Sequence, residues 1–350
     1  MSRKQFSIWW VDDQTERLNR LAIQSIENGV KFGKRTLRAK VDVVRLKTPE
    51  DRDAFEKKLD AAERDKNLPH LIVMDQNLNV PEGLRGSNLA VAIRADYSSV
   101  PVVGVTAVEF QKIVDLQRDQ FIELFCLDDL QSGDRVPDLF AIAESFEELV
   151  RNYSSSGTTQ TRTTKILKWL ACPPDDSEFL AICLPGAFLA KWDIETPHSF
   201  ARWVWHTFIG RAGFLYDDLE IATMLGVKES GLKHLLSTLS DCEYEGLFAS
   251  NSPTRRRWWV SKVRRVIRKA SKAAMTDPLW TLGRKLITDK HSKDFSHCHG
   301  ARSKSCVPDV VAYSDDTLND RVQARNEDTQ PVQTDTPPVG FEQRRVFSRR

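Results

Sequence analysis

Acidic residues follow three of the apolar segments in the first 130 residues of the chain. Asp12 and Asp13 follow the first segment, Asp75 follows the third, and Asp128 and Asp129 follow the last. The carboxyl ends of parallel strands meet at one edge of a sheet, so we expect these carboxylates to lie close together. Close carboxylates repel one another unless a cation lies among them, and oxygen ligands with room for water are typical of Mg²⁺. A carboxylate beside Mg²⁺ can accept a phosphoryl group.

The elements that must position these carboxylates alternate along residues 1–151. Apolar segments predict five strands, and amphipathic segments between them predict helices. Strands are expected at 6–11, 41–46, 70–74, 100–106 and 121–127, and helices at 15–28, 49–66, 86–96, 110–118 and 139–151. This alternation is typical of a parallel sheet with helices on both faces, here a five-stranded flavodoxin-like α/β domain. The alternative is that each acid only begins a loop or caps a helix.

Residues 152–164 are polar and are interpreted as a linker to a second domain over 165–275. Within it, 217–239 fits a helix-turn-helix. Asp217 is a plausible N-cap, and Gly226 lies in the turn, where a positive φ is easiest for glycine. Apolar residues then pack the second helix on the first; they are Ile221, Leu225, Val227, Leu232, Leu235, Leu236 and Leu239.

Positive charge is concentrated in this second domain. Residues 1–150 carry a net charge of −5 and residues 151–350 a net charge of +7, and 246–276 hold nine basic residues and no acidic one. A strand-like segment at 244–249 and a turn precede Arg255, which predicts a hairpin with a basic tip. Residues 263–274 follow as a helix with one basic face. A cationic module of this kind favours polyanions, although a solvated basic surface remains the alternative.

The first domain resembles the receiver domain of two-component response regulators. Residues 10–13 (WVDD), 72–75 (IVMD) and 100–107 (VPVVGVTA) carry the resemblance. It implies that Asp75 is the phosphoacceptor and that Mg²⁺ is held by Asp12, Asp13, Asp75 and the backbone carbonyl of Asn77. It also implies that Thr106 and Phe125 form the switch, with Thr106 contacting the phosphate.

One position departs from the family pattern. A lysine that pairs with the phosphate is usual after the fifth strand, and Asp128 stands at that place. An anion there removes a phosphate partner and adds repulsion against the phosphoryl group. The domain can therefore also be interpreted as a degenerate receiver that serves for docking.

Residues 195–265 resemble a winged-helix domain. By this resemblance the second helix of the helix-turn-helix lies in the major groove of double-stranded DNA, and the hairpin touches phosphates. The candidate DNA-binding residues are Lys228, Ser230, Lys233, His234, Arg255, Arg256, Arg257, Lys262, Arg264 and Arg268. One such module makes a small interface, so we expect a homodimer.

The C-terminal extension, 276–350, carries histidines and cysteines in its first part and turns polar beyond about residue 315, where we expect disorder. The candidate zinc ligands are His291, His297, Cys298, His299 and Cys306, but their spacing matches no paired zinc motif and does not favour Zn²⁺. The six cysteines form no dense framework, so reduced thiols are expected.

These observations favour a cytoplasmic response regulator without enzymatic activity. At 41% hydrophobic and 29% charged residues the chain can bury a core, and it has no apolar run long enough to cross a membrane. The expected partners are double-stranded DNA and a cognate sensor histidine kinase, and the expected cofactor is Mg²⁺. Two alternatives stay open: an interaction adaptor with degenerate receiver and winged-helix domains, and a metal-dependent enzyme acting on nucleic acid.

Overall fold

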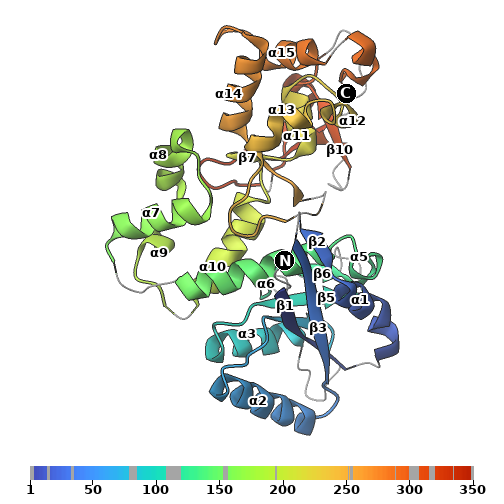
Figure 1. Cartoon of the computed structure of the whole chain (residues 1–350), viewed down its shortest axis with the longest axis vertical. Coiled ribbons are helices and arrows are strands. Elements are labelled where there is room, and N and C mark those ends of the chain that lie inside the picture. The colour runs from blue at the N-terminus through green and yellow to red at the C-terminus, as the bar shows by residue number, and fades with distance from the viewer. Residues whose placement is uncertain are drawn as a thin grey trace. The chain divides into compact units, whose positions relative to one another are not determined.

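The chain forms two compact units that interleave along the sequence (Figure 1). The computed structural model describes all residues except 1–3, 14–15, 33–34, 79–84, 108–119, 153–156, 194, 251, 253–254, 288, 299–306, 315–319, 334 and 348–350. Unit 1 comprises Met1–Arg162, Pro185–Thr207 and Leu247–Pro253, and unit 2 comprises Thr163–Leu184, Phe208–Gly246 and Thr254–Arg350. The chain thus passes between the units several times instead of crossing one linker. Part of the expected linker is helical, in α7 (Thr159–Trp169).

The sheet of unit 1 has six strands in the order β2-β3-β1-β4-β5-β6. Their bounds are β1 (Lys4–Asp12), β2 (Val30–Phe32), β3 (Arg35–Arg45), β4 (Leu71–Asp75), β5 (Val102–Thr106) and β6 (Leu124–Cys126). Five strands pair in parallel, and β2 pairs antiparallel with β3 at the edge. The prediction of five strands is corrected by this hairpin. The first half of β3, which pairs with the edge strand β2, alternates basic residues with apolar ones, so hydropathy did not mark it.

Helices flank this sheet in unit 1. They are α1 (Glu16–Asn28), α2 (Pro49–Arg64), α3 (Gly86–Asp96), α5 (Leu127–Ser132) and α6 (Val136–Asn152). A reciprocal capping box between Thr48 and Asp51 begins α2. The short α5 was not predicted, because residues 121–127 were assigned to a strand that in fact ends at Cys126. The helix expected at 110–118 lies outside the described residues.

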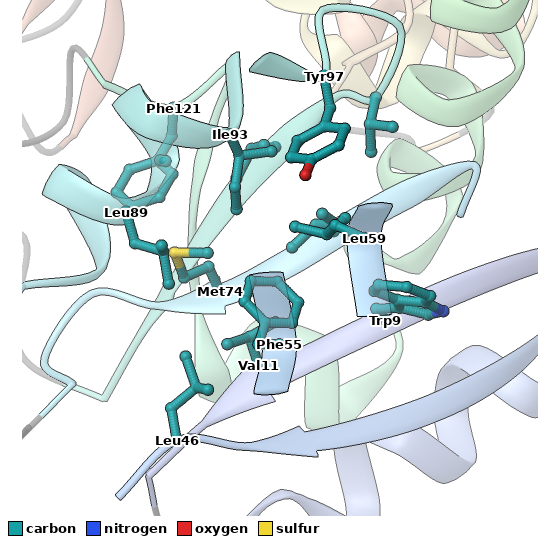
Figure 2. Packing of buried hydrophobic residues seen from close by; sticks show 14 of the residues in the cluster. Trp9, Val11, Leu46, Phe55, Leu59, Met74, Leu89, Ile93, Tyr97 and Phe121 are labelled. Atoms are coloured by element: carbon teal, nitrogen blue, oxygen red, sulfur yellow. The ribbon is translucent and has the colours of Figure 1, made fainter. Parts of the chain in front are cut away.

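Alternate residues of β1 face opposite layers of the unit, and both faces are covered, which is why the strand is apolar without a break from Ile8 to Val11. On one face the side chains of α2 and α3 pack with those of β1 and β4 in the core shown in Figure 2, which includes Trp9, Val11, Phe55, Leu59, Met74, Leu89 and Ile93. On the other face Phe6 meets Phe140 of α6 edge to face, with ring centroids 5.5 Å apart. This double burial holds the carboxyl ends of the strands in place.

Two later segments of the chain complete unit 1. Pro185–Thr207 contains α9 (Gly186–Leu189), α10 (Thr196–Trp203) and most of the π-helix η2 (Val204–Phe208). The indole of Trp205 donates a hydrogen bond to the buried Glu123 at 2.5 Å. In Leu247–Pro253, the backbone N–H of Phe248 donates to Ser145 Oγ at 2.6 Å. Buried polar contacts therefore fix both segments within unit 1.

Unit 2 contains the first helix and the turn of the expected helix-turn-helix, while the expected second helix is divided into two short helices. Its elements are α8 (Pro174–Cys183), β7 (Leu215–Tyr216), α11 (Asp218–Met224), α12 (Glu229–Leu232), α13 (Leu236–Leu239), η3 (Ser240–Cys242), β8 (Trp258–Trp259), α14 (Val260–Ser271), α15 (Leu279–Leu286) and η5 (Asp289–Asp294). Asp217 caps α11 as predicted, and Gly226 adopts φ +69° in the turn. A Cβ at Gly226 would lie 2.9 Å from the main chain of Trp280, so the turn also requires a small residue. The apolar positions of the motif form one core with α14 and α15.

The C-terminal extension is folded where the structure describes it, which corrects the expectation of disorder beyond residue 315. After β9 (Val310–Tyr313) come β10 (Arg321–Ala324), η6 (Asn326–Asp328), β11 (Thr329–Pro331) and β12 (Arg345–Phe347). The four strands pair in the order β10-β9-β12-β11 and bury Ala312, Ala324 and Val346. Polar side chains such as Gln323, which donates to the carbonyl of Val227 at 2.8 Å, hold the sheet to the helices of unit 2. None of the described helices combines the length and apolarity needed to cross a membrane.

Candidate functional site

Three carboxylates meet at the carboxyl edge of the sheet in unit 1. Asp12 is the last residue of β1, Asp13 follows it, and Asp75 is the last residue of β4, which pairs with β1 in parallel. Each offers an oxygen within 4.8 Å of the others. The structure thus brings together the three acids that the sequence singled out as cation ligands.

Hydrogen bonds orient the two carboxylates at the strand ends. Asp12 is buried, and its Oδ2 accepts from Asn19 Nδ2 of α1 at 2.5 Å and from the indole of Trp10 at 3.4 Å. Asp75 Oδ1 accepts from the backbone N–H of Asn77 at 3.0 Å. Sequence reasoning missed Asn19. The sequence did hold a signal for Asn19. It lies in the first turn of α1, the helix that follows Asp13, and a polar side chain at that position can reach back to the end of β1.

Burial raises the pKa of Asp75 from 3.8 to about 6, and repulsion from Asp12 and Asp13 acts in the same direction. The hydrogen bond from Asn77 opposes this rise but does not cancel it. The carboxylate of Asp75 is therefore an anion held at a cost in free energy beside two other acids. A cation at this edge would relieve that cost.

The neighbouring backbone approaches Asp75 closely. Asp75 is in register with Val105, so the buried Thr106 lies one residue further along the adjacent strand β5. A Cβ on Gly86, the first residue of α3, would lie 2.0 Å from the carbonyl oxygen of Asp75, so only glycine lets the helix begin here. Thr106 and the start of α3 thus border the carboxylate cluster. The predicted roles of Thr106 and of the Asn77 carbonyl remain predictions.

The donor set fits a hard divalent cation. Three carboxylates supply the oxygen ligands that Mg²⁺ prefers, and the partly exposed Asp13 and Asp75 leave room for water. The pKa of Asp75 is raised first by burial and further by repulsion from Asp12 and Asp13, and a cation would offset both effects. Asp12, Asp13 and Asp75 would therefore hold the ion.

The last strand places its residues differently from the sequence prediction. Asp128 is exposed in the first turn of α5 and does not belong to the three-carboxylate cluster, and neither does Asp129. The expectation that five acids converge is corrected, because β6 ends at Cys126 and α5 begins at once. Phe125 is fully buried, and the guanidinium of Arg135 lies 5.0 Å from its ring centroid. Phe125 is therefore a core residue in this structure.

The basic hairpin predicted in unit 2 is not formed as expected. Residues 244–249 form turns and no strand; a single bridge joins Glu243 to Trp258, and Leu247–Pro253 belongs to unit 1. Arg256 donates to Asp218 at 2.6 Å, and Arg257 donates to the carbonyl of Ile209 at 2.7 Å. Arg255 is half-buried as well. Arg256 and Arg257 are therefore engaged within the protein, and with the half-buried Arg255 they do not form an exposed basic tip.

The second helix of the motif also differs. The prediction of one continuous helix is corrected, since α12 ends at Leu232 and α13 begins at Leu236. Lys228, Ser230 and Lys233 are exposed at this end of unit 2. His234 is half-buried, and its Nε2 lies 3.2 Å from Asp294 Oδ2, so it is not an open DNA contact.

Helix α14 and its C-cap residue Lys272 carry several exposed basic side chains. Arg264, Arg265, Lys269 and Lys272 are exposed, while Val263 and Ile267 are buried on the opposite side. Three of the DNA-binding candidates donate to main-chain carbonyls: Lys262 to that of Asp241 at 3.3 Å, Arg268 to that of Ala274 at 2.7 Å, and the exposed Lys228 to that of Lys293 at 2.7 Å.

The described histidines and cysteines of the extension do not gather as one cluster. His297 is exposed, Cys298 is disulfide-bonded, and His299 and Cys306 lie outside the described residues. The disulfide corrects the expectation of reduced thiols at Cys298. The other described cysteines carry free thiols. His291 instead stacks on His234, with ring centroids 3.9 Å apart.

No protein-family model and no curated protein sequence matches this chain. Among solved structures, the signal receiver domain of the putative response regulator NarL from Mycobacterium tuberculosis is similar at 14% identity over 40% of this chain and 98% of that one, with a TM-score of 0.28. RcsB from Salmonella enterica serovar Typhimurium, bound to promoter P1flhDC, is similar at 14% identity. The match covers 51% of this chain and 91% of that one, with a TM-score of 0.26. An F420-dependent methylene-tetrahydromethanopterin dehydrogenase is similar at 14% identity. The match covers 57% of this chain and 86% of that one, with a TM-score of 0.24. At such low TM-scores these similarities carry no argument about function.

Proposed function

We propose that this protein is a response regulator in which unit 1 is a Mg²⁺-dependent receiver and unit 2 binds double-stranded DNA. The observation that carries the proposal is the convergence of Asp12, Asp13 and Asp75 at the carboxyl ends of two paired parallel strands, with Thr106 ending the next strand. Without β2, the strand order β3-β1-β4-β5-β6 supports a doubly wound, flavodoxin-like sheet, a class whose sites lie at this edge.

In this proposal Asp75 is the phosphoacceptor. Its pKa of about 6 leaves it largely ionised at pH 7, as a nucleophile must be. One oxygen of Asp75 forms a bond to phosphorus while the bond from phosphorus to the donor's leaving group breaks. The ion would neutralise charge on the phosphoryl oxygens. Thr106 would donate a hydrogen bond to one of them, and a sensor histidine kinase would supply the group in the cell.

For unit 2, we propose that the exposed basic face of α14 and the two exposed lysines that flank α12, Lys228 and Lys233, contact phosphates. The element order β7, α11, α12 and β8, with β7 and β8 paired, supports a winged-helix-like arrangement. Lys228, Lys233 and Arg264 are the residues from the sequence prediction that remain exposed and cationic. A homodimer would double this small interface.

Phosphoryl incorporation tests the receiver proposal directly. The full chain is incubated with Mg²⁺ and a small acyl phosphate, and its intact mass is measured. We expect one added phosphoryl group in the wild type, none in Asp75→Asn, and one in the matched control Asp128→Asn, whose exposed carboxylate lies outside the cluster. Labelling that persists in Asp75→Asn excludes Asp75 as the acceptor.

A phosphorylation-independent adaptor is the second candidate. It is favoured by Arg256 and Arg257, which donate to groups of the protein itself, and by Asp128, which stands in the sequence where the family has a lysine. It predicts no incorporation in any variant and no salt-dependent binding to duplex DNA.

A further inference from the structure

A second group of metal-binding side chains lies in unit 2. His234 comes from the turn between α12 and α13, and His291 and Asp294 come from η5. Each offers a donor atom within 4.8 Å of the others. His234 Nε2 lies 3.2 Å from Asp294 Oδ2, and the two imidazole rings stack with an interplanar angle of 24°.

Main-chain contacts hold the two segments together beside this group. The backbone N–H of Lys228 donates to the carbonyl of Asp294 at 2.8 Å, and that of Ser296 donates to the carbonyl of Gly226 at 3.1 Å. Gly231 allows close approach, since a Cβ there would lie 3.0 Å from Cβ of Asp294. The ligand positions are therefore prepared by the fold of unit 2, and the carboxylate of Asp294 is largely shielded from water.

We propose that His234, His291 and Asp294 bind a first-row divalent transition metal, with Zn²⁺ as the expected ion. Two imidazoles and one carboxylate are ligands that zinc takes in open sites, where water fills the fourth position. Zinc–ligand bonds of about 2.0–2.2 Å bring tetrahedral donors to about 3.4 Å from one another. The present separations, of at most 4.8 Å, require side-chain movements of about 1 Å. Both histidines are half-buried, which leaves access for ion and water.

The charges near the proposed site determine how tightly we expect it to bind the metal ion. Lys233 and Lys293 act electrostatically on Asp294 and compete with the cation. Three protein ligands and two nearby ammonium groups predict weaker binding than in a closed four-ligand site. The competing explanation is a histidine–aspartate hydrogen bond with a stacked second imidazole, which needs no ion.

Metal titration of the full chain distinguishes a metal site from a histidine–aspartate hydrogen bond that needs no ion. The protein is stripped with EDTA and titrated with Zn²⁺ by calorimetry in excess Mg²⁺, which keeps the carboxylates of unit 1 occupied. Co²⁺ is titrated in parallel and followed by its visible d–d absorption. We expect one Zn²⁺ equivalent in the wild type and a loss of affinity of at least about tenfold in His291→Ala and Asp294→Asn. His297→Ala, exposed in the same segment, and Asp75→Asn are matched controls that should bind as the wild type does.

The proposal is overturned if the wild type takes up no ion, if His291→Ala and Asp294→Asn bind unchanged, or if His297→Ala alone loses binding. Folding is checked by circular dichroism without metal. If His291→Ala is unfolded, the conservative His291→Gln replaces it. Asp75→Asn also separates this site from the receiver proposal, because it removes the phosphoacceptor and leaves the zinc ligands intact.

Discussion

Among single residues, Asp75 is the group on which the proposed phosphoryl chemistry depends. Its pKa is raised to about 6, first by burial and then by Asp12 and Asp13. A carboxyl group whose pKa is higher in the folded state stabilises the fold when protonated. That contribution is full below pH 3.8 and is lost as pH rises through about 6, so at neutral pH the ionised Asp75 destabilises unit 1.

We expect Asp75→Asn to raise the free energy of unfolding by about 1–3 kcal/mol at pH 7 without divalent cations, because the amide carries no charge to desolvate. The gain should shrink toward pH 5. Mg²⁺ should stabilise the wild type and narrow the difference. Urea denaturation at both pH values, with and without Mg²⁺, measures this. Asp128→Asn, at an exposed position, is the control and should leave the free energy of unfolding unchanged. If Asp75→Asn is less stable than the wild type at pH 7, burial of the charged carboxylate does not destabilise the fold.

At the scale of elements, the first turn of α11 is tied to the C-terminal sheet by one arginine. Arg321 of β10 donates to both Asp217 and Glu220, the two members of the capping box of α11. Burial raises the pKa of Glu220 to about 7, with repulsion from Asp217 adding to the rise and Arg321 opposing it. Ionised Glu220 therefore costs stability as pH rises above 4.5 through about 7, and Arg321 reduces that cost.

Arg321→Met keeps much of the side-chain volume and removes the charge. We expect a loss of about 2–3 kcal/mol in unfolding free energy at pH 8, since two largely buried carboxylates lose their cation. The loss should be smaller at pH 6, where Glu220 is protonated more readily. Arg325→Met is the matched control, because its ion pair with Glu327 is exposed on both sides. Equal effects of the two substitutions in urea denaturation would rule out the proposed tie.

For the whole molecule, the division of charge along the chain matters more than its net value of +2. Among the basic residues predicted to bind DNA, Lys228, Lys233 and Arg264 remain exposed, on α14 or beside α12, whereas Arg256 and Arg257 are engaged in internal contacts. Phosphate contacts release counterions, so each one lost lowers the salt dependence of DNA binding by about 0.9 in the log–log slope.

The double substitution of Arg264→Gln and Lys269→Gln should weaken duplex binding and reduce the salt slope by about 2. Fluorescence anisotropy at several salt concentrations measures both quantities. Lys57→Gln with Arg64→Gln removes the same charge from the exposed side of α2 in unit 1 and should leave the slope unchanged. If both double variants lose the same affinity for duplex DNA, binding depends on net charge alone and not on the basic face of α14.

The sequence by itself determined the alternation of strands and helices in unit 1, the meeting of Asp12, Asp13 and Asp75, and the cap and turn at Asp217 and Gly226. These features depend on apolar periodicity and on residues close in the chain, which local patterns report. Only the tertiary structure decided that Asp128 stays outside the carboxylate cluster, that Leu247–Pro253 belongs to unit 1, and that the polar tail pairs into strands.

The physical reason is that those outcomes rest on partners far away in the chain. The bonds from Arg321 to Asp217 and from Phe248 to Ser145 each join residues about a hundred positions apart. A polar strand such as β10 becomes stable only when backbone and side-chain partners satisfy it. His234 and His291 likewise meet only through folding, because no spacing between them in the sequence signals the contact between their rings.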